Sequence, residues 1–148
     1  MYLKVRIAEQ DRDACRFLWR NTSGKLDNLR LQRVWFGLTC SFFLAINTLR
    51  VHARRHQDAA PRAAAEILEN MYVDDLATSC DMIEEAKELA GELRGLLASG
   101  GFRFHKWARN EPRALASVSD EERSASSKSH FWKTLGMQWD LRDDHLTF

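Results

Sequence analysis

The chain has 148 residues, a length that allows one domain with a single hydrophobic core. Its 22 basic and 21 acidic residues nearly balance, which excludes a general electrostatic attraction to nucleic acid and leaves only local patches for such binding. No apolar stretch is long enough for a membrane span, and three cysteines without CxxC spacing are typical of a reducing compartment, so we expect an intracellular, cytoplasmic protein without a signal peptide.

The first part of the chain has the alternation of β-strands. Apolar and basic residues alternate over 2–8, which predicts a strand that pairs with a second strand over 16–20. A third strand is expected around 28–35, after a polar turn. Because Tyr2 already lies inside the first predicted strand, we interpret the chain as a fragment of a longer protein.

Three helices are expected in the middle of the chain. Apolar residues at helical spacing predict helices around 41–56, 60–70 and 82–99. Pro61 is typical of a first helical turn, and Asp81 with Glu84 resembles a capping box at the start of the third helix.

The last part of the chain returns to strands. We expect a strand over 102–107, a mobile serine-rich loop over 110–130, and a hairpin over 131–148. Together these elements predict the α+β class, with an antiparallel sheet and helices packed on one of its faces, in one domain over 1–148.

The segment Tyr72-Val73-Asp74-Asp75 carries the strongest chemical signal. A β-branched residue and an aromatic before two acidic residues predict a β-hairpin over 70–80 whose turn carries the carboxylates. Adjacent negative charges repel each other, and Mg²⁺ would relieve that repulsion because it takes carboxylate and phosphate oxygens together. A plain solvated turn is the alternative.

This segment resembles the hairpin motif of reverse transcriptases, and four other segments lie in matching order around it. The amino-acid sequences of these segments are similar to those of the BEL/Pao group of long-terminal-repeat retrotransposons. The matching segments, taken in chain order, are Arg12 to Trp19, Arg33 to Ala45, Gly101 to Trp107 and Leu135 to Asp140.

The resemblance implies a partial polymerase palm, that is, a fragment of an RNA-directed DNA polymerase that uses two Mg²⁺ ions. In this family Asp74 and Asp75 would bind metal, and Lys106 would protonate the leaving pyrophosphate or neutralise a phosphate. The resemblance also places a further catalytic aspartate upstream of Met1. We therefore expect the isolated chain to bind metal poorly and to polymerise little or not at all.

Other site residues also come from the resemblance. Tyr2 would lie beneath the sugar of the incoming nucleotide, and Gly37 and Ser41 would lie beside template and nucleotide. Leu135 and Gly136 would contact the primer from a primer-grip-like hairpin. For Tyr2 the alternative is a core aromatic, and for Lys106 it is a solvated surface lysine.

The implied partners are an RNA or DNA template-primer and deoxynucleotides, once the chain is extended, with no membrane partner and an open oligomeric state. The alternative is a non-catalytic module, derived from a retroelement, that binds nucleic acid or protein. Arginines that alternate with aromatic residues suit a nucleic-acid groove or a half-exposed sheet. They are Arg16, Arg20, Arg30, Arg33, Arg103 and Arg109, with Trp19, Trp35, Phe102 and Trp107.

Overall fold

The computed structural model describes residues 1–119, 122, 131–134 and 136–148. The chain divides into two compact units, Met1–Leu49 and Arg50–Phe148. No helix among the described residues is long and apolar enough to cross a membrane. Helices and small antiparallel sheets occur together, which confirms the α+β class.

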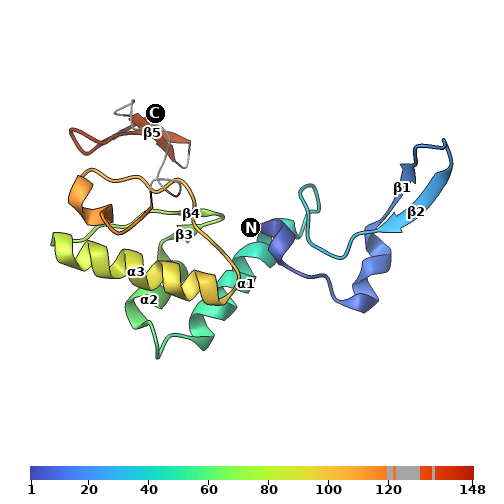
Figure 1. Ribbon diagram of the computed structural model, residues 1–148, viewed down its shortest axis with the longest axis horizontal. Helices are drawn as coiled ribbons and strands as arrows, with labels where there is room; N and C mark the ends of the chain where they lie inside the picture. The colour runs from blue at the N-terminus through green and yellow to red at the C-terminus, as the bar shows by residue number, and fades with distance from the viewer. Residues whose placement is uncertain (120–121, 123–130, 135) are drawn as a thin grey trace. The chain divides into compact units, whose positions relative to one another are not determined.

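The first unit consists of two short 3-10 helices, a two-stranded sheet and the start of a helix (Figure 1). The strand predicted over 2–8 is wrong. Residues 2–4 form a 3-10 turn, and only the residues after it pair, with 32–34 rather than with 16–20. The elements are η1 (Tyr2–Lys4), η2 (Glu9–Cys15), β1 (Arg16–Arg20), β2 (Leu26–Arg30) and the first residues of α1 (Ser41–Arg55).

Local turn chemistry explains why β1 pairs with β2. The Asn21 side-chain oxygen accepts hydrogen bonds from the backbone N–H groups of Ser23 and Lys25, at 3.1 and 3.0 Å. An asparagine that bonds the backbone two residues on stabilises a tight turn, and this turn brings the next strand back along β1. The strand predicted at 28–35 is therefore displaced toward the turn and ends at Arg30.

The three predicted helices are confirmed, as α1, α2 (Pro61–Glu69) and α3 (Ile83–Ser99). Pro61 lies in the first turn of α2, as the sequence predicts. The predicted capping box is wrong because α3 starts later. Its N-cap residue is Met82, which makes no side-chain cap hydrogen bond.

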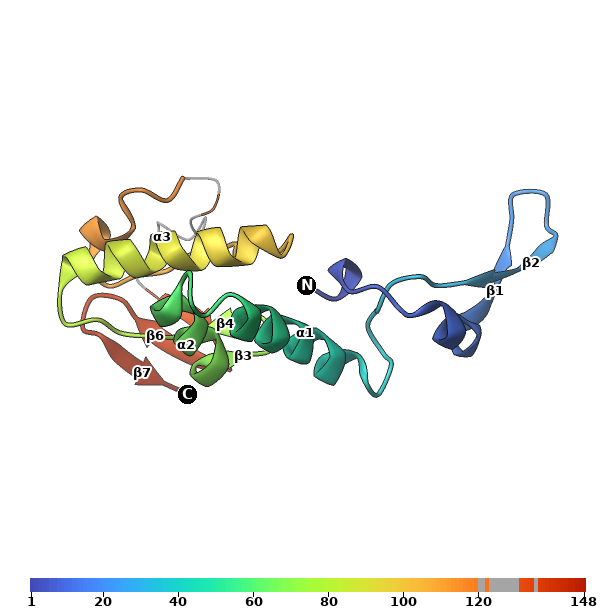
Figure 2. The same cartoon turned by 90° about the horizontal axis from the view of Figure 1, so that it is seen from below.

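The core of the second unit lies between helices. α2 packs on α3, and Figures 1 and 2 show the two helices side by side. The buried side chains of α2 are Ala63, Ala64 and Ile67, and those of α3 are Leu89, Ala90, Leu93, Leu96 and Leu97.

A histidine connects the end of α1 to the end of α3. His52 Nε2 lies 2.7 Å from the carbonyl oxygen of Leu96, and because a carbonyl only accepts, this nitrogen carries the hydrogen. The imidazole also lies 3.0 Å from the place that a Cβ at Gly100 would occupy. The last turn of α3 is therefore closely packed against His52.

The strands of the described chain form three separate antiparallel sheets instead of the single sheet expected. After the β1–β2 pair, the second is the hairpin of β3 (Met71–Tyr72) and β4 (Asp75–Leu76). The third is the meander of β5 (Phe131–Thr134), β6 (Met137–Asp140) and β7 (His145–Thr147), which includes the hairpin expected over 131–148.

The segment after α3 differs from its prediction. No strand forms over 102–107, and the expected loop contains the 3-10 helix η3 (Pro112–Leu115). Leu115 and Val118 are buried against Ala90 of α3, with Trp107 beside them. Leu115 and Val118 are three residues apart in a polar stretch, and two positions are too few to give a periodic signal in the sequence. The rest of the predicted loop, 120–121 and 123–130, lies outside the described residues.

Two glycines on the exposed side of α3 weaken the helix. A Cβ added at Gly91 or Gly95 meets nothing within 4 Å, so Gly91→Ala and Gly95→Ala should each stabilise the chain by about 0.5–1 kcal/mol. Gly100→Ala is the contrasting variant, because its methyl group would press on the His52 ring. Urea unfolding followed by circular dichroism measures all three. A loss of stability in the first two variants would contradict the free space around them.

Candidate metal-binding hairpin

The β3–β4 hairpin presents the two acidic residues that the sequence singles out. Met71 pairs with Leu76 and Tyr72 with Asp75, which leaves Val73 and Asp74 as the two turn residues. The hairpin over 70–80 is therefore confirmed in a shorter form, with Asp74 in the turn and Asp75 as the first residue of β4.

Strand pairing separates a buried from an exposed side of this hairpin. Cross-strand partners point to the same face, so Met71 and Leu76 share one face while Tyr72 and Asp75 share the other. Met71 is buried and Leu76 half-buried, whereas Tyr72 and Asp75 are exposed. The hairpin is held by its apolar pair and turns its carboxylates to solvent.

The backbone of the turn is strained. Val73 has a φ of 57°, in the left-handed region that a β-branched side chain rarely occupies. Glycine is the usual residue at such a position in a two-residue hairpin. Strained residues of this kind persist where surrounding structure holds them, and they concentrate at functional sites.

The carboxylates of Asp74 and Asp75 fit the requirements of a hard cation. Both side chains are exposed, and within the described residues neither forms an ion pair or a side-chain hydrogen bond. Mg²⁺ is commonly bound by one or two carboxylates, with water and phosphate oxygens as its other ligands. No group of three or more potential metal ligands occurs in the described part of the chain. The hairpin therefore offers two ligands.

Three predicted nucleotide-binding residues come together within the first unit. The rings of Tyr2 and Phe36 are in contact, with centroids 4.6 Å apart, and Gly37 follows with a φ of 95°. The Ser41 hydroxyl donates a hydrogen bond to the carbonyl oxygen of Trp35, which closes the loop that contains Gly37. The glycine is needed here because the loop takes a left-handed turn.

The remaining predicted residues lie on two other segments of the second unit. Lys106 is exposed, follows α3, and has a φ of 62°, in the same left-handed region as Val73. The next residue, Trp107, packs edge-on against Phe104 and anchors the segment, with ring centroids 5.5 Å apart. Gly136 lies in the β5–β6 turn with a φ of 79°. Leu135 lies outside the described residues.

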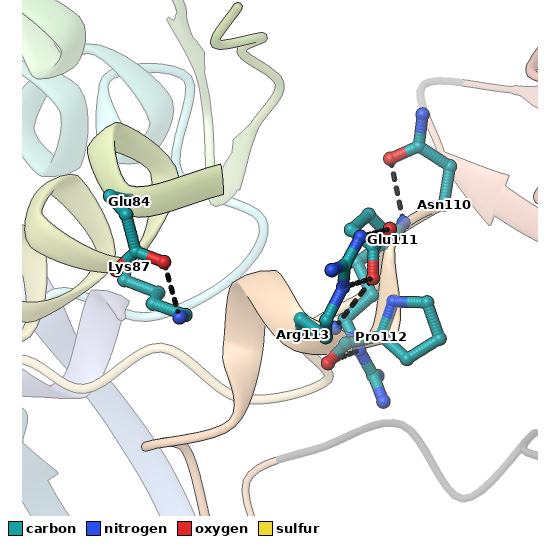
Figure 3. A network of polar contacts seen from close by, with 7 residues as sticks. Glu84, Lys87, Asn110, Glu111, Pro112 and Arg113 are labelled. Carbon is teal, nitrogen blue, oxygen red and sulfur yellow. Dashed lines mark hydrogen bonds and ion pairs between the residues drawn. The ribbon is translucent and has the colours of Figure 1, made fainter. Parts of the chain in front are cut away.

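A local ion-pair cluster lies in the segment beyond Lys106 (Figure 3). The Arg113 guanidinium donates to both carboxylate oxygens of Glu111, each at 3.0 Å, and the backbone N–H of Arg113 donates at 2.9 Å. These hydrogen bonds lower the pKa of Glu111 to about 2. Neighbouring Asn110 accepts from the backbone N–H of Glu111. We did not predict this cluster, and its one sequence signal is Pro112, a residue typical of a first helical turn, directly after Glu111.

The aromatic residues that alternate with arginines in the sequence differ in burial. Phe102 is buried, and Trp107 packs beside the buried cluster of Ala90, Leu115 and Val118, so neither is free to stack on a base. Trp19, by contrast, is exposed on β1. The segment with Phe102 and Trp107 and the segment with Trp19 have similar residue types at similar spacing. Only their packing distinguishes the covered rings from the exposed one.

A comparison with protein-family models, with curated proteins and with solved structures gives no match to this chain.

Substitutions at Val73 measure the strain in the turn. Val73→Gly should be more stable than Val73→Ala by about 1 kcal/mol, because alanine keeps the left-handed penalty that glycine avoids. Both variants lose the valine methyl groups, so the effect of that loss on stability cancels when the two are compared with each other. Thermal unfolding followed by circular dichroism measures the difference. Equal stability of the two variants would show that the turn is not strained.

The Glu111 carboxylate should titrate at unusually low pH. Because its pKa of about 2 lies below the ordinary value of 4.5, its ion pair is fully formed above about pH 4.5 and is lost as the pH falls toward 2. Carbon-detected NMR of the side-chain carboxyl measures the midpoint. Arg113→Gln should return it toward the ordinary range, while Arg109→Gln, which removes a minor contribution, should change it little. A midpoint near 4.5 in the unsubstituted chain would contradict the cluster.

Proposed function

We propose that this chain is a reverse-transcriptase palm of the BEL/Pao type, a part of an RNA-directed DNA polymerase in which Asp74 and Asp75 bind Mg²⁺. The observation that carries the proposal is the β3–β4 hairpin. It holds two adjacent, exposed carboxylates at a turn whose backbone is strained. Unpaired like charges and a left-handed valine both cost stability, and a metal site gives a reason for their presence.

The first unit gives independent support. Tyr2, Gly37 and Ser41 are far apart in the sequence from the hairpin, and the resemblance assigns them to nucleotide and template. The contact of Tyr2 with Phe36 and the bond of Ser41 to Trp35 gather all three around one loop. An exposed glycine turn beside an aromatic ring suits close approach of a nucleotide.

Each residue has a role that its chemistry permits. Bound Mg²⁺ would stabilise the charge that develops on the attacking and leaving oxygens in nucleotidyl transfer. Asp74 and Asp75 supply oxygen ligands, and the Tyr2 ring provides a surface for the sugar. Lys106 is an exposed cation that can neutralise a phosphate or donate a proton to pyrophosphate.

Divalent-metal binding tests the proposal directly. Mn²⁺ added at substoichiometric amounts should broaden the amide NMR signals of residues 72–76 before the others, because a paramagnetic ion relaxes nearby nuclei even when it binds weakly. Asp74→Asn should remove this selective broadening. Primer extension on an RNA template gives a second measurement. The yield of any Mg²⁺-dependent product should fall in Asp74→Asn by more than roughly 10- to 100-fold, which is the loss expected when a residue that only hydrogen-bonds to a metal ligand is removed.

Asp81→Asn is the matched control. Asp81 is exposed, lies a few residues beyond the hairpin, and has no role in the proposed site, so its variant should behave like the unsubstituted chain. Broadening centred on the acidic turn 140–144 instead of the hairpin would overturn the metal assignment. Broadening that persists in Asp74→Asn would do the same.

A further inference from the structure

One edge of β1 has no partner strand in the β1–β2 ribbon. Among the described residues, β1 pairs with β2 alone. Figures 1 and 2 show the ribbon extending beyond η2, with no other element of the first unit beside it. A two-stranded ribbon is only marginally stable by itself, and the backbone groups along a free edge can pair with another chain. A further strand can therefore be added at the edge of β1.

The hydrogen bonds at the two ends of the ribbon show which backbone groups of β1 face this edge. The Leu31 N–H donates to the Cys15 carbonyl oxygen at 3.0 Å, and the Asn21 N–H donates to the Lys25 carbonyl oxygen at 2.9 Å. Residues of an antiparallel strand bond alternately to one neighbour and to the other side. Cys15, Asn21 and every second residue between them therefore bond to β2. The residues whose N–H and C=O groups point to the free edge are Arg16, Leu18 and Arg20.

The register of the ribbon places these three residues on one face. Directly opposite residues share a face, and successive residues of a strand alternate between faces. The face here called the arginine face carries three cross-strand pairs, which are Arg16 with Arg30, Leu18 with Asn28, and Arg20 with Leu26. The opposite face, here called the aromatic face, carries two pairs, which are Phe17 with Leu29 and Trp19 with Asp27.

The arginine face has an excess of positive charge. Arg16 and Arg30 share one carboxylate oxygen of Asp13, at 3.0 and 2.9 Å. Arg20 donates to the carbonyl oxygen of Gly24 at 2.8 Å, and no carboxylate in the described part of the chain pairs with it. Three guanidiniums therefore share a single negative charge, and a strand with carboxylates on this face would be attracted.

The aromatic face favours the opposite chemistry. Phe17, Trp19 and Leu29 are large apolar side chains that remain exposed, and the one charged residue among them is Asp27. Apolar side chains of an added strand would cover the rings, whereas acidic side chains there would be repelled by Asp27. Because a shift of one residue exchanges the two faces of a strand, the ribbon distinguishes between the two possible registers of an acidic strand.

We propose that the free edge of β1 binds an extended acidic peptide, which adds to the ribbon as a third, antiparallel strand. Two carboxylates four residues apart pair with Arg16 and Arg20, and the residue midway between them lies beside Leu18. The two remaining positions pack apolar side chains on Phe17 and Trp19. In this mode of recognition the main-chain hydrogen bonds supply affinity and alternate side chains supply specificity. The inference goes beyond the proposed function, because it uses no metal and no residue of the β3–β4 hairpin.

A second copy of the chain and a nucleic-acid strand fit this edge less well. Antiparallel pairing of β1 with itself about Leu18 would place Arg16 opposite the partner's Arg20, and directly opposed like charges are destabilising. A nucleic-acid strand that stacks bases on Trp19 and pairs phosphates with Arg20 would have to reach both faces at once. Charge complementarity therefore favours an acidic peptide.

Amide hydrogen exchange measured by NMR tests which edge is used. The probe is a synthetic peptide with the core Glu-Val-Leu-Val-Glu between Gly-Ser ends, added to the full chain. It should slow exchange at Arg16, Leu18 and Arg20, whose N–H groups gain partners, and should change Phe17 and Trp19 little because β2 already binds their N–H groups. The matched control peptide has the core Val-Glu-Leu-Glu-Val. Its carboxylates are two residues apart, so at most one can meet an arginine, and protection should be weaker.

Fluorescence anisotropy of the labelled peptide measures the contribution of one arginine. Arg20→Gln removes one opposite-charge pair and should weaken binding roughly 1.5- to 5-fold. Lys4→Gln is the matched control, because it removes an exposed charge from η1 and should leave the affinity unchanged. Amide NMR spectra of both variants verify that the fold is retained.

A reversal of charge distinguishes direct pairing from a general electrostatic effect. Arg20→Glu should bind the core Lys-Val-Leu-Val-Glu more tightly than the core Glu-Val-Leu-Val-Lys, although the two peptides have the same composition. Antiparallel addition gives this preference because it places the first residue of the core opposite position 20 and the last opposite Arg16.

Each outcome of these experiments decides the inference. Slowed exchange at the three edge residues of β1, together with the preference of Arg20→Glu, supports it. Equal affinity of Arg20→Glu for the two charge-reversed peptides overturns it, as does protection confined to β2. Tighter binding of an oligo(dT) strand than of the acidic peptide also overturns it. So does concentration-dependent association of the chain that the peptide does not displace, because a second copy would then occupy the edge.

Discussion

The packing of α2 against α3 is the interaction on which the candidate metal site depends. Ile67 of α2 and Leu93 and Leu97 of α3 are among the largest fully buried side chains, and each contributes about 1.5–3 kcal/mol through burial. Only Asn70 separates α2 from β3, and its side chain and backbone both bond back to Glu66, at 2.7 and 2.8 Å. The end of the helix therefore fixes the direction in which the hairpin leaves it.

This anchoring explains how a strained turn can persist. A left-handed valine costs about 1–2 kcal/mol, and two adjacent carboxylates add repulsion, while the hairpin itself has only two residue pairs. So short a hairpin does not hold such a turn alone. Burial of Met71 beside α2 joins the hairpin to the helical core, and the free energy of that core offsets the strain. The backbone that carries the two carboxylates is thus held in place, although in the described part of the chain neither side chain forms an ion pair or a hydrogen bond.

The sequence predicts the helices and the hairpin well because their signals are local. Periodic apolar residues and Pro61 define the helices, and Tyr72-Val73-Asp74-Asp75 defines the turn. Prediction from the sequence fails where a contact with a residue distant in the sequence decides the local structure. The alternation over 2–8 predicts a strand that pairs with 16–20. The Asn21 turn instead brings β2 alongside β1, so residues 16–20 pair with β2. No sequence signal reports a φ of 57° at Val73, because glycine is the residue expected there. Phe102 and Trp19 have similar neighbours, and only packing separates the buried ring from the exposed one.

The two units depend on different interactions. Two carboxylates could share a cation only if the backbone keeps them in place, so a metal site at the β3–β4 hairpin would depend on the helical core. The β1–β2 ribbon has little core of its own, because all five residues of β1 are exposed. Its register depends instead on the Asn21 turn, whose side-chain oxygen accepts from the backbone N–H groups of Ser23 and Lys25. A substitution in the helical core should therefore alter the hairpin, whereas a substitution at Asn21 should alter the ribbon.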